Sequence, residues 1–431
     1  MKISLESAHA RWLFFVGIVL LAGSSVLLAG KVWLAASWSA SPDPELWLRA
    51  AQLEPTNADY WQRLGLYEKW DFERGDVRQA VVYYQRATEV NPRSDVSWMD
   101  LAAAYEAVGQ TARAQEAFEK AQASHPISSD VAWRYGNFLL RQRDIFKAFA
   151  QIRQALMIDP TLTVAAVSET WKASKDLPKI LTEVLPAQSR YYLIALDYFL
   201  SQHQLDAALT VWDRLLGLKQ SLEMAQVVPL LNELIAQNQV EDAQRAWRQA
   251  LQTAGWPQNG DDSSLIFNGG FEHDLVNGGF DWREDPIPGA AFSFDSSVVH
   301  SGTRSLRITF DGSANLDFQH LRQFLVVDPR HRYHFAAYLR TEGISTDSGI
   351  RFAVYDASSP SALPMLTADQ VGTHPWSQVE TELITGPQTH LLTIVLRRAP
   401  SEKFDNKLRG TVWVDDVSLV PGFGDARVSP R

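Results

Sequence analysis

The sequence contains no cysteine. This absence excludes disulfide bonds, catalytic thiols, thiolate metal sites and a lipoprotein anchor, but it does not settle the cellular compartment. An excess of positive charge is also missing, because 40 Lys and Arg residues face 50 Asp and Glu residues, which gives a net charge of −10. A nucleic-acid-binding protein needs a basic face to displace counterions from phosphates, so the composition argues against that class.

Recognisable catalytic motifs are missing as well. The sequence has no glycine-rich phosphate loop, no HExxH and no GxSxG. Asp281, Glu284 and Asp285 could supply the acid and base of a glycosidase, but turn-rich segments accumulate such residues for other reasons. We therefore predict a protein that is not an enzyme. The alternative is a glycan-cleaving hydrolase, or its targeting subunit, that acts on cell-surface polysaccharide.

One long uncharged run lies near the N-terminus, from Trp12 to Gly30. As a helix it would rise about 28 Å, close to the thickness of a bilayer core. We interpret residues 1–11 as a cytoplasmic start, 12–34 as a transmembrane signal anchor and 35–44 as a linker, with the bulk of the chain on the periplasmic side of a bacterial membrane. The alternatives are a cleaved signal peptide and a scaffold that faces the cytoplasm.

Residues 60–160 repeat with a period of 34 residues. A small residue, a large residue four positions later and a closing proline recur at this spacing, as in Ala80, Ala114 and Ala148; Tyr84, Phe118 and Ile152; and Pro92, Pro126 and Pro160. Each unit would pair two short helices, which must stack on their neighbours to bury their apolar faces. The pattern resembles the tetratricopeptide repeat, which implies a superhelix that binds a partner protein.

Helical periodicity continues in degenerate form after Pro160, and we assign residues 45–255 to one solenoid. In this repeat family, ligands often lie on the concave face made by the first helix of each repeat. The resemblance places six residues on that face: Gln62, Lys69, Trp70, Glu106, Arg134 and Arg141. These residues predict a groove for a protein partner, although an ordinary solvated surface would carry similar side chains.

The composition changes at Gly255. Residues 256–264 are rich in Gly, Asn, Asp and Ser and predict a linker. Between 265 and 421, eight short runs of β-branched and aromatic residues alternate with turn residues, and 422–431 predicts a flexible tail. Antiparallel strands in this number predict a jelly-roll β-sandwich. The predicted fold class is therefore multidomain α + β, with an N-terminal transmembrane helix, an all-α superhelix and an all-β sandwich.

Four motifs mark this last region: Asn268-Gly-Gly-Phe-Glu272, Gly279-Phe-Asp-Trp282, Ser301-Gly-Thr-Arg-Ser-Leu306 and Val412-Trp-Val-Asp-Asp-Val-Ser-Leu419. Together they resemble the galactose-binding-like sandwiches that include carbohydrate-binding modules of bacterial glycanases. The resemblance implies a structural calcium ion that ties the opening segment to the final strand, with Glu272, Asp415 and Asp416 as carboxylate ligands. Without an ion, these carboxylates would satisfy backbone donors and arginines such as Arg304.

A sugar site needs exposed aromatic rings beside hydrogen-bonding side chains, because a pyranose has an apolar face and a polar rim. Six residues are candidates for this glycan face, although such aromatics more often belong to a core: Trp282, Tyr338, Tyr355, Trp376, Arg340 and Arg351. We predict a membrane-anchored envelope scaffold that binds a protein through its superhelix and a glycan or protein through its sandwich. The domain combination resembles envelope proteins suspected of working in exopolysaccharide or O-antigen assembly.

Overall fold

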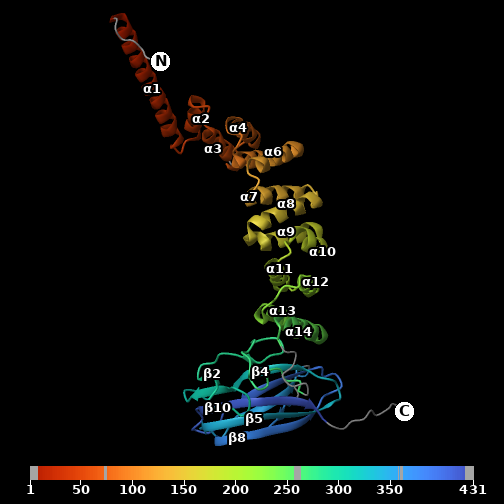
Figure 1. Ribbon diagram of the computed structural model, residues 1–431. Coiled ribbons are helices and arrows are strands. Elements are labelled where there is room, and N and C mark those ends of the chain that lie inside the picture. The colour runs from red at the N-terminus through yellow and green to blue at the C-terminus, as the bar shows by residue number, and fades with distance from the viewer. Residues whose placement is uncertain (1–7, 72–74, 257–263, 358, 360–362, 423–431) are drawn as a thin grey trace, which may run out of the picture. The chain divides into compact units, whose positions relative to one another are not determined.

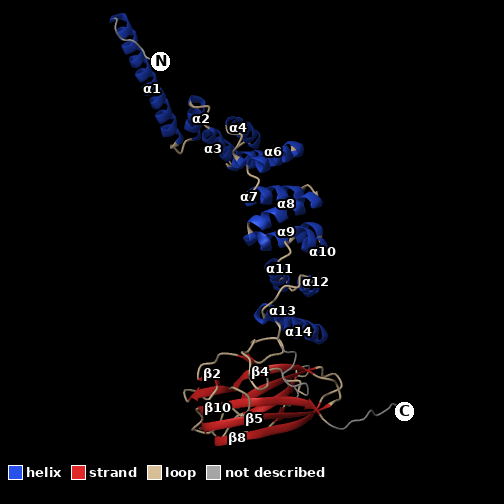
Figure 2. Ribbon diagram, viewed as in Figure 1, coloured by secondary structure: helices blue, strands red, loops and turns tan. Residues whose placement is uncertain are grey.

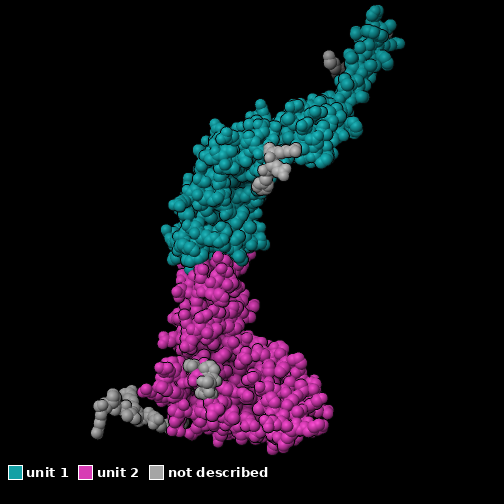
Figure 3. All heavy atoms as spheres, turned by 180° about the vertical axis from the view of Figure 1, so that it is seen from behind, with its two compact units in different colours: residues 1–187 teal, residues 188–431 magenta. Residues whose placement is uncertain are grey.

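The computed structural model describes residues 8–71, 75–256, 264–357, 359 and 363–422. The chain divides into two compact units, residues 1–187 and residues 188–431 (Figure 3). Helices form the first unit and begin the second, and the strands follow in the C-terminal part of the chain (Figure 2). This arrangement confirms the predicted multidomain α + β fold.

Helix α1 (Ala8–Ser39) is long and apolar. Its most apolar window has a mean hydropathy of 2.4, and none of that window is buried against the rest of the described chain. By length and composition, α1 could cross a membrane. The helix runs to Ser39, so the linker expected at 35–44 shortens to a turn before the next helix begins at Pro44. Most of the predicted cytoplasmic start, residues 1–7, lies outside the described residues.

The first unit continues as short helices in succession (Figure 1). They are α2 (Pro44–Leu53), α3 (Ala58–Trp70), α4 (Val77–Val90), α5 (Asp95–Ala107), α6 (Thr111–Ser124), α7 (Ser129–Arg141), α8 (Ile145–Ile158), the 3-10 turn η1 (Pro160–Leu162), α9 (Thr163–Ser174), α10 (Leu177–Lys179) and the π-turn η2 (Ile180–Val184).

Small residues stand where the paired helices of the repeat cross. Ala80, Ala114 and Ala148 are all fully buried. A Cβ atom at Gly65 would lie 2.7 Å from the Tyr84 ring, and one at Gly136 would lie 2.7 Å from Cγ1 of Ile152. The small residue therefore makes room for the large residue of the partner helix, as the repeat pattern predicts.

The second unit begins with helices α11 (Ser189–Ser201), α12 (Leu205–Leu216), α13 (Met224–Ala236) and α14 (Val240–Ala254). The last two helices pack directly on the β-sandwich. Trp247 of α14 makes edge contacts with Phe267 and Phe280, at ring-centroid distances of 5.2 and 6.1 Å. Asn232 Oδ1 of α13 accepts hydrogen bonds from the Gly279 N–H and from Arg283, at 3.1 and 2.7 Å.

The close approach of α13 and α14 to the sandwich explains a pair of glycines in the loop that precedes β1. A Cβ atom at Gly278 would lie 2.4 Å from Cγ1 of Val228, and one at Gly279 would lie 2.8 Å from the Trp247 ring. The helical periodicity assigns α13 and α14 to one solenoid at 45–255, and the composition predicts a linker at 256–264 before the sandwich. The two helices belong to the same compact unit as the sandwich, and residues 257–263 of the expected linker lie outside the described residues.

The sandwich consists of two antiparallel sheets, with strand orders β1-β4-β9-β6-β7 and β2-β3-β10-β5-β8. The strands are β1 (Arg283–Glu284), β2 (Ala290–Asp295), β3 (Ser305–Asp311), β4 (Phe318–Val326), β5 (Arg332–Ile344), β6 (Arg351–Asp356), β7 (Met365–Leu366), β8 (Gly372–Ile384), β9 (Leu391–Arg398) and β10 (Arg409–Pro421). All eight predicted strands are present, and the short β1 and β7 are additional.

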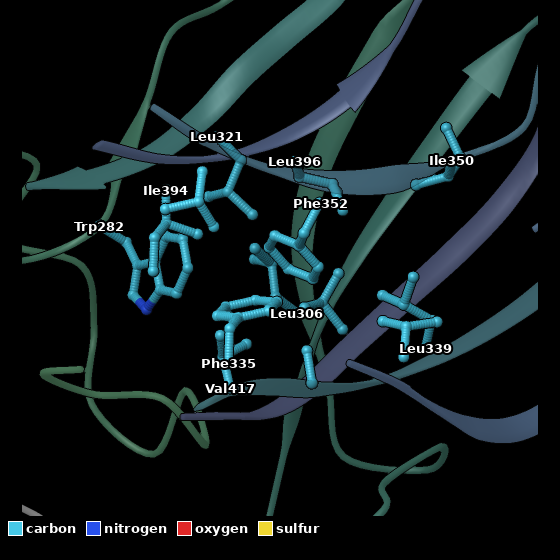
Figure 4. Close-up of a cluster of buried hydrophobic side chains, with 14 of the residues drawn as sticks. Trp282, Leu306, Leu321, Phe335, Leu339, Ile350, Phe352, Ile394, Leu396 and Val417 are labelled. Atoms are coloured by element: carbon cyan, nitrogen blue, oxygen red, sulfur yellow. The ribbon is translucent and has the colours of Figure 1, made fainter. Parts of the chain in front are cut away.

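Alternate residues of both sheets point into one shared core (Figure 4). Phe335 of β5 and Phe352 of β6 meet there, with their ring centroids 5.1 Å apart. On β10 the register with β5 shifts between Asp415 and Ser418, and Asp416 adopts a left-handed φ of 47°. At this irregularity, Asp415 and Asp416 both accept hydrogen bonds from the turn that precedes β3.

Candidate functional site

The three carboxylates predicted to bind calcium all accept hydrogen bonds from the turn at residues 300–304. Asp415 Oδ2 accepts hydrogen bonds from the backbone N–H groups of His300 and Ser301, at 2.8 and 3.3 Å. Asp416 accepts from the Ser301 hydroxyl at 2.8 Å, and its other oxygen lies 2.5 Å from Nδ1 of His300. Glu272 Oε1 accepts from the Thr303 N–H at 2.8 Å. The opening segment and the last strand thus meet at this turn.

Protein donors already bind these carboxylates. Although partial burial opposes ionisation of Glu272, hydrogen bonds from Thr303 and Arg304 lower its pKa. Burial raises the pKa of Asp415 in spite of its backbone hydrogen bonds. Their oxygens are of the type that suits calcium, but no group of three or more His, Cys, Asp or Glu side chains among the described residues is placed to hold a metal ion. The calcium site therefore stays a prediction.

An aromatic cluster lies beside this turn, on the outer surface of the second sheet. His300 stacks on Tyr338 of β5, with ring centroids 3.6 Å apart and planes at 16°, and Trp376 of β8 makes an edge contact with the same imidazole at 5.7 Å. Sequence reasoning did not identify His300. Its only signal was its position directly before the Ser301–Leu306 motif.

Tyr338 forms one wall of a hollow of about 480 Å³ at the same place. Its other walls include Glu272, Ser301, Gln378 and Asp416. The Tyr338 ring is half-buried, and its hydroxyl lies 3.4 Å from Oε1 of Gln378. An apolar ring bordered by carboxylate, amide and hydroxyl groups can contact the apolar face of a sugar and bind its hydroxyls.

The other predicted glycan-binding residues do not join this hollow. Trp282 is fully buried, stacks on Phe271 and donates from Nε1 to the Asn268 carbonyl at 3.2 Å. Its prediction as a glycan platform was wrong, because the ring fills the core. Arg340 lies over the Trp413 ring at 5.5 Å, on the same sheet as Tyr338.

Tyr355 and Arg351 lie on β6, in the opposite sheet from Tyr338. Arg351 pairs with Asp369 at 2.9 Å, and the Tyr355 hydroxyl accepts a hydrogen bond from Arg397. The six predicted residues therefore do not form a single face. Asp281, considered above as a catalytic acid, is fully buried and cannot reach a glycosidic bond.

The predicted groove of the first unit is a connected polar network. Asp100 of α5 is its centre, because Gln62 Nε2 donates to one carboxylate oxygen at 2.5 Å and an Arg134 nitrogen lies 3.7 Å from the other. Burial raises the pKa of Asp100, and the cations Lys69 and Arg134 oppose this shift. Sequence reasoning missed Asp100, because nothing in the repeat pattern marks an acid at that position.

The remaining predicted groove residues border this centre. Arg141 of α7 binds both oxygens of Glu106 on α5, at 2.8 and 2.9 Å. Burial lowers the pKa of Lys69, whose ammonium lies 5.3 Å from the Trp70 ring centroid. Trp70 itself is 58% exposed. The face thus combines paired charges with an accessible aromatic ring.

Comparison with known proteins found a family model that matches part of the first unit. Residues 83–116 match the family model of the tetratricopeptide repeat. No curated protein matches the chain. A tetratricopeptide repeat protein from Parabacteroides merdae is 14% identical, covers 52% of this chain and 92% of its own length, and has a TM-score of 0.30.

Two further solved structures show similar values. YrrB, described as a tetratricopeptide repeat protein with an unusual peptide-binding site, is 12% identical, covers 49% of this chain and 94% of its own, and has a TM-score of 0.26. A structure described as "CBM4 structure and function" is 14% identical, covers 36% of this chain and 99% of its own, and has a TM-score of 0.27. Because these TM-scores are low, we assign the fold of each region from the helical repeats and the β-sheets of this chain. The repeats and sheets give a helical repeat region followed by a β-sandwich of two antiparallel sheets.

Proposed function

We propose that the protein is a membrane-anchored envelope scaffold whose sandwich binds glycan in the hollow beside Tyr338. One observation carries this proposal: a half-buried aromatic ring borders a space of about 480 Å³ together with Glu272, Ser301, Gln378 and Asp416. The space has the size of a small-ligand site, and its walls offer hydrogen-bond acceptors and donors around an apolar surface. Work in exopolysaccharide or O-antigen assembly would suit such a protein.

The test is a glycan array followed by calorimetric titration of the full chain in detergent. Tyr338→Ala should weaken binding of a glycan found on the array about tenfold or more, because the substitution removes the stacking surface. Tyr355→Ala is the matched control, since it removes an equally half-buried tyrosine from the opposite sheet. Equal affinity of both variants and the wild type would contradict the proposal.

A protein partner on the concave face of the repeats is the second part of the proposal. The network around Asp100 and the exposed Trp70 support it, because interfaces favour aromatic residues and arginines as anchors. Trp70→Ala should reduce recovery of such a partner in cross-linked membranes. Substitution of Ile127, which is exposed at the start of the α7 segment, serves as the control.

Membrane anchoring by α1 and a periplasmic location complete the proposal. The apolar, unburied window of α1 supports the anchor. Protease treatment of spheroplasts should digest the sandwich while the cytoplasmic marker proteins stay intact. Survival of the sandwich under those conditions would instead favour a scaffold that faces the cytoplasm.

Calcium binding is a separate proposal, supported by the convergence of three carboxylates on one turn. An ion would have to replace some of the protein donors that these oxygens now accept. The thermal midpoint of the full chain in calcium and in EDTA tests it. A midpoint that does not depend on calcium would contradict calcium binding without affecting the glycan proposal.

A further inference from the structure

A cleft lies between α14 and the neighbouring end of β4, within the second unit. Two hollows, of about 480 and 170 Å³, share Gln244 and Val326 as lining residues and therefore adjoin each other. The cleft exists because α13 and α14 are fixed to the sandwich through Trp247 and Asn232. It is separate from the hollow beside Tyr338, with which it shares only Phe267 among its lining residues.

One side of the cleft is the open edge of a β-strand. Strand β1 covers β4 only at Leu321 and Arg322, whereas β4 continues to Val326. The Val327 N–H donates to the His390 carbonyl, in line with β9. Because consecutive residues of an antiparallel strand direct their backbone groups to opposite sides, Val326 and Phe324 direct theirs away from β9. No other strand pairs with that side among the residues the structure describes.

The inner part of the cleft is aromatic. Trp247 and Phe280 are almost fully buried, and the half-buried Phe324 lies beside them in the lining. The outer part of the cleft contains polar side chains that make no hydrogen bond within the described residues. Within the described residues, no hydrogen bond or ion pair involves the side chains of Gln239 or Gln244. Gln239 is the N-cap of α14 and makes no side-chain capping bond, and the first turn of that helix also lines the mouth.

The mouth carries an excess of negative charge. Glu241 and Asp328 are exposed and form no ion pair with any described residue, whereas Asp242 is neutralised by Arg245 at 2.6 Å. Two further arginines lie toward the inner part: Arg248 lines it, and the Arg283 guanidinium lies 4.8 Å from the Phe324 ring centroid. A ligand with lysine or arginine residues therefore fits the mouth better than an acidic one.

We propose that this cleft binds an extended basic peptide, which adds a short strand to the open edge of β4. A peptide strand offers N–H and C=O groups in the alternation that the backbone of Phe324 and Val326 requires, and its side chains alternate between two faces. An apolar side chain can enter the hollow lined by Trp247 and Phe280, while a basic one lies near Glu241. A sugar would satisfy the hydrogen-bonding side chains but would leave the strand edge unpaired.

The test uses a blocked heptapeptide in which lysine alternates with valine and phenylalanine. Binding to the full chain in detergent is measured by fluorescence anisotropy, and hydrogen exchange is followed at residues 322–328. We expect the peptide to bind and to slow exchange in that segment. A matched peptide with N-methyl groups on alternate residues cannot pair on one edge, so it should bind about tenfold more weakly. This comparison leaves the fold of the protein unchanged.

Two substitutions check the position of the peptide. Glu241→Lys should weaken binding several-fold, whereas Glu116→Lys, at an exposed position in α6, should have no effect. Equal binding of the N-methylated peptide would overturn strand addition. Displacement of the peptide by a neutral oligosaccharide, with retention in Tyr338→Ala, would show that the cleft is a sugar site and would also overturn the proposal.

Discussion

Asp100 in the first unit and Asp281 in the second are both carboxylates whose pKa values are raised by burial, yet their surroundings differ. Asp100 lies among Gln62, Lys69 and Arg134, which neighbouring repeats supply. Asp281 is fully buried, accepts a hydrogen bond from the Val276 N–H at 2.7 Å, and leaves its second oxygen without a partner among the described residues. No described cation contributes to its pKa, which is raised to about 7.

This difference follows from how each architecture brings residues together. Stacked repeats place equivalent positions of successive helices side by side, so opposite charges of neighbouring repeats can pair. The sandwich joins loops that are distant in sequence, and the carboxylates of Asp281, Asp415 and Glu272 accept hydrogen bonds from backbone N–H groups of these loops. A partner of the helical face would therefore compete with existing ion pairs, whereas a ligand of the proposed hollow would contact the half-buried Tyr338 ring, which already stacks on His300.

The largest effect is expected for Trp282→Ala. Removing a fully buried ring from the sandwich core should cost about 3–5 kcal/mol of unfolding free energy. Urea unfolding followed by hydrogen exchange should show the loss in residues 264–422, while α3 to α8 keep their protection. Equal loss of protection in both units would show that they unfold together and would remove the distinction drawn here.

The next effect is a pH dependence at Asp281. The folded-state pKa of about 7 exceeds the ordinary value of 3.8, so the folded protein binds the proton more tightly. Its contribution to stability is fully present below about pH 4 and is lost as the pH rises through 7. Relative to the wild type, Asp281→Asn should therefore be stabilised by roughly 2–4 kcal/mol at pH 8 but not at pH 4. Asp213→Asn, at an exposed site on α12, is the control.

A smaller effect is expected for Gly136→Ala in the first unit. The new Cβ atom would meet Cγ1 of Ile152 at 2.7 Å, and overpacking of this kind costs about 1–3 kcal/mol. Thermal unfolding measures the loss. The double variant Gly136→Ala/Ile152→Ala should recover little of the lost stability, because Ile152→Ala leaves a cavity. However, Gly136→Ala should destabilise Ile152→Ala much less than it destabilises the wild type.

The smallest effect on stability is expected for Glu106→Gln. Its ion pair with Arg141 is more than half exposed at the arginine, and such pairs contribute about 0–1 kcal/mol. Partner binding at the concave face should change much more than stability does, which a pull-down at matched protein levels can show. A loss of stability above this range would mean that the network also supports the repeat fold.

Sequence reasoning succeeded where the fold depends on local periodicity. The 34-residue spacing located the buried Ala80, Ala114 and Ala148, and runs of β-branched and aromatic residues between turn residues located eight strands. It failed where the outcome depends on distant partners. Nothing in the sequence states that β6 and β5 belong to opposite sheets, so Tyr355 and Tyr338 could not be separated. Likewise, the role of His300 depends on Tyr338 and Trp376, which are distant in sequence.

The packing of α13 and α14 on the sandwich also determines which fragments of the chain stay in solution. Phe267 and Phe280 are covered by Trp247, and each is only about one-twentieth exposed in the intact unit. A fragment that begins after α14 would present both rings to water as one apolar patch, and such patches promote association. Expression of the sandwich alone should therefore yield aggregates, whereas a fragment that begins before α11 should stay in solution.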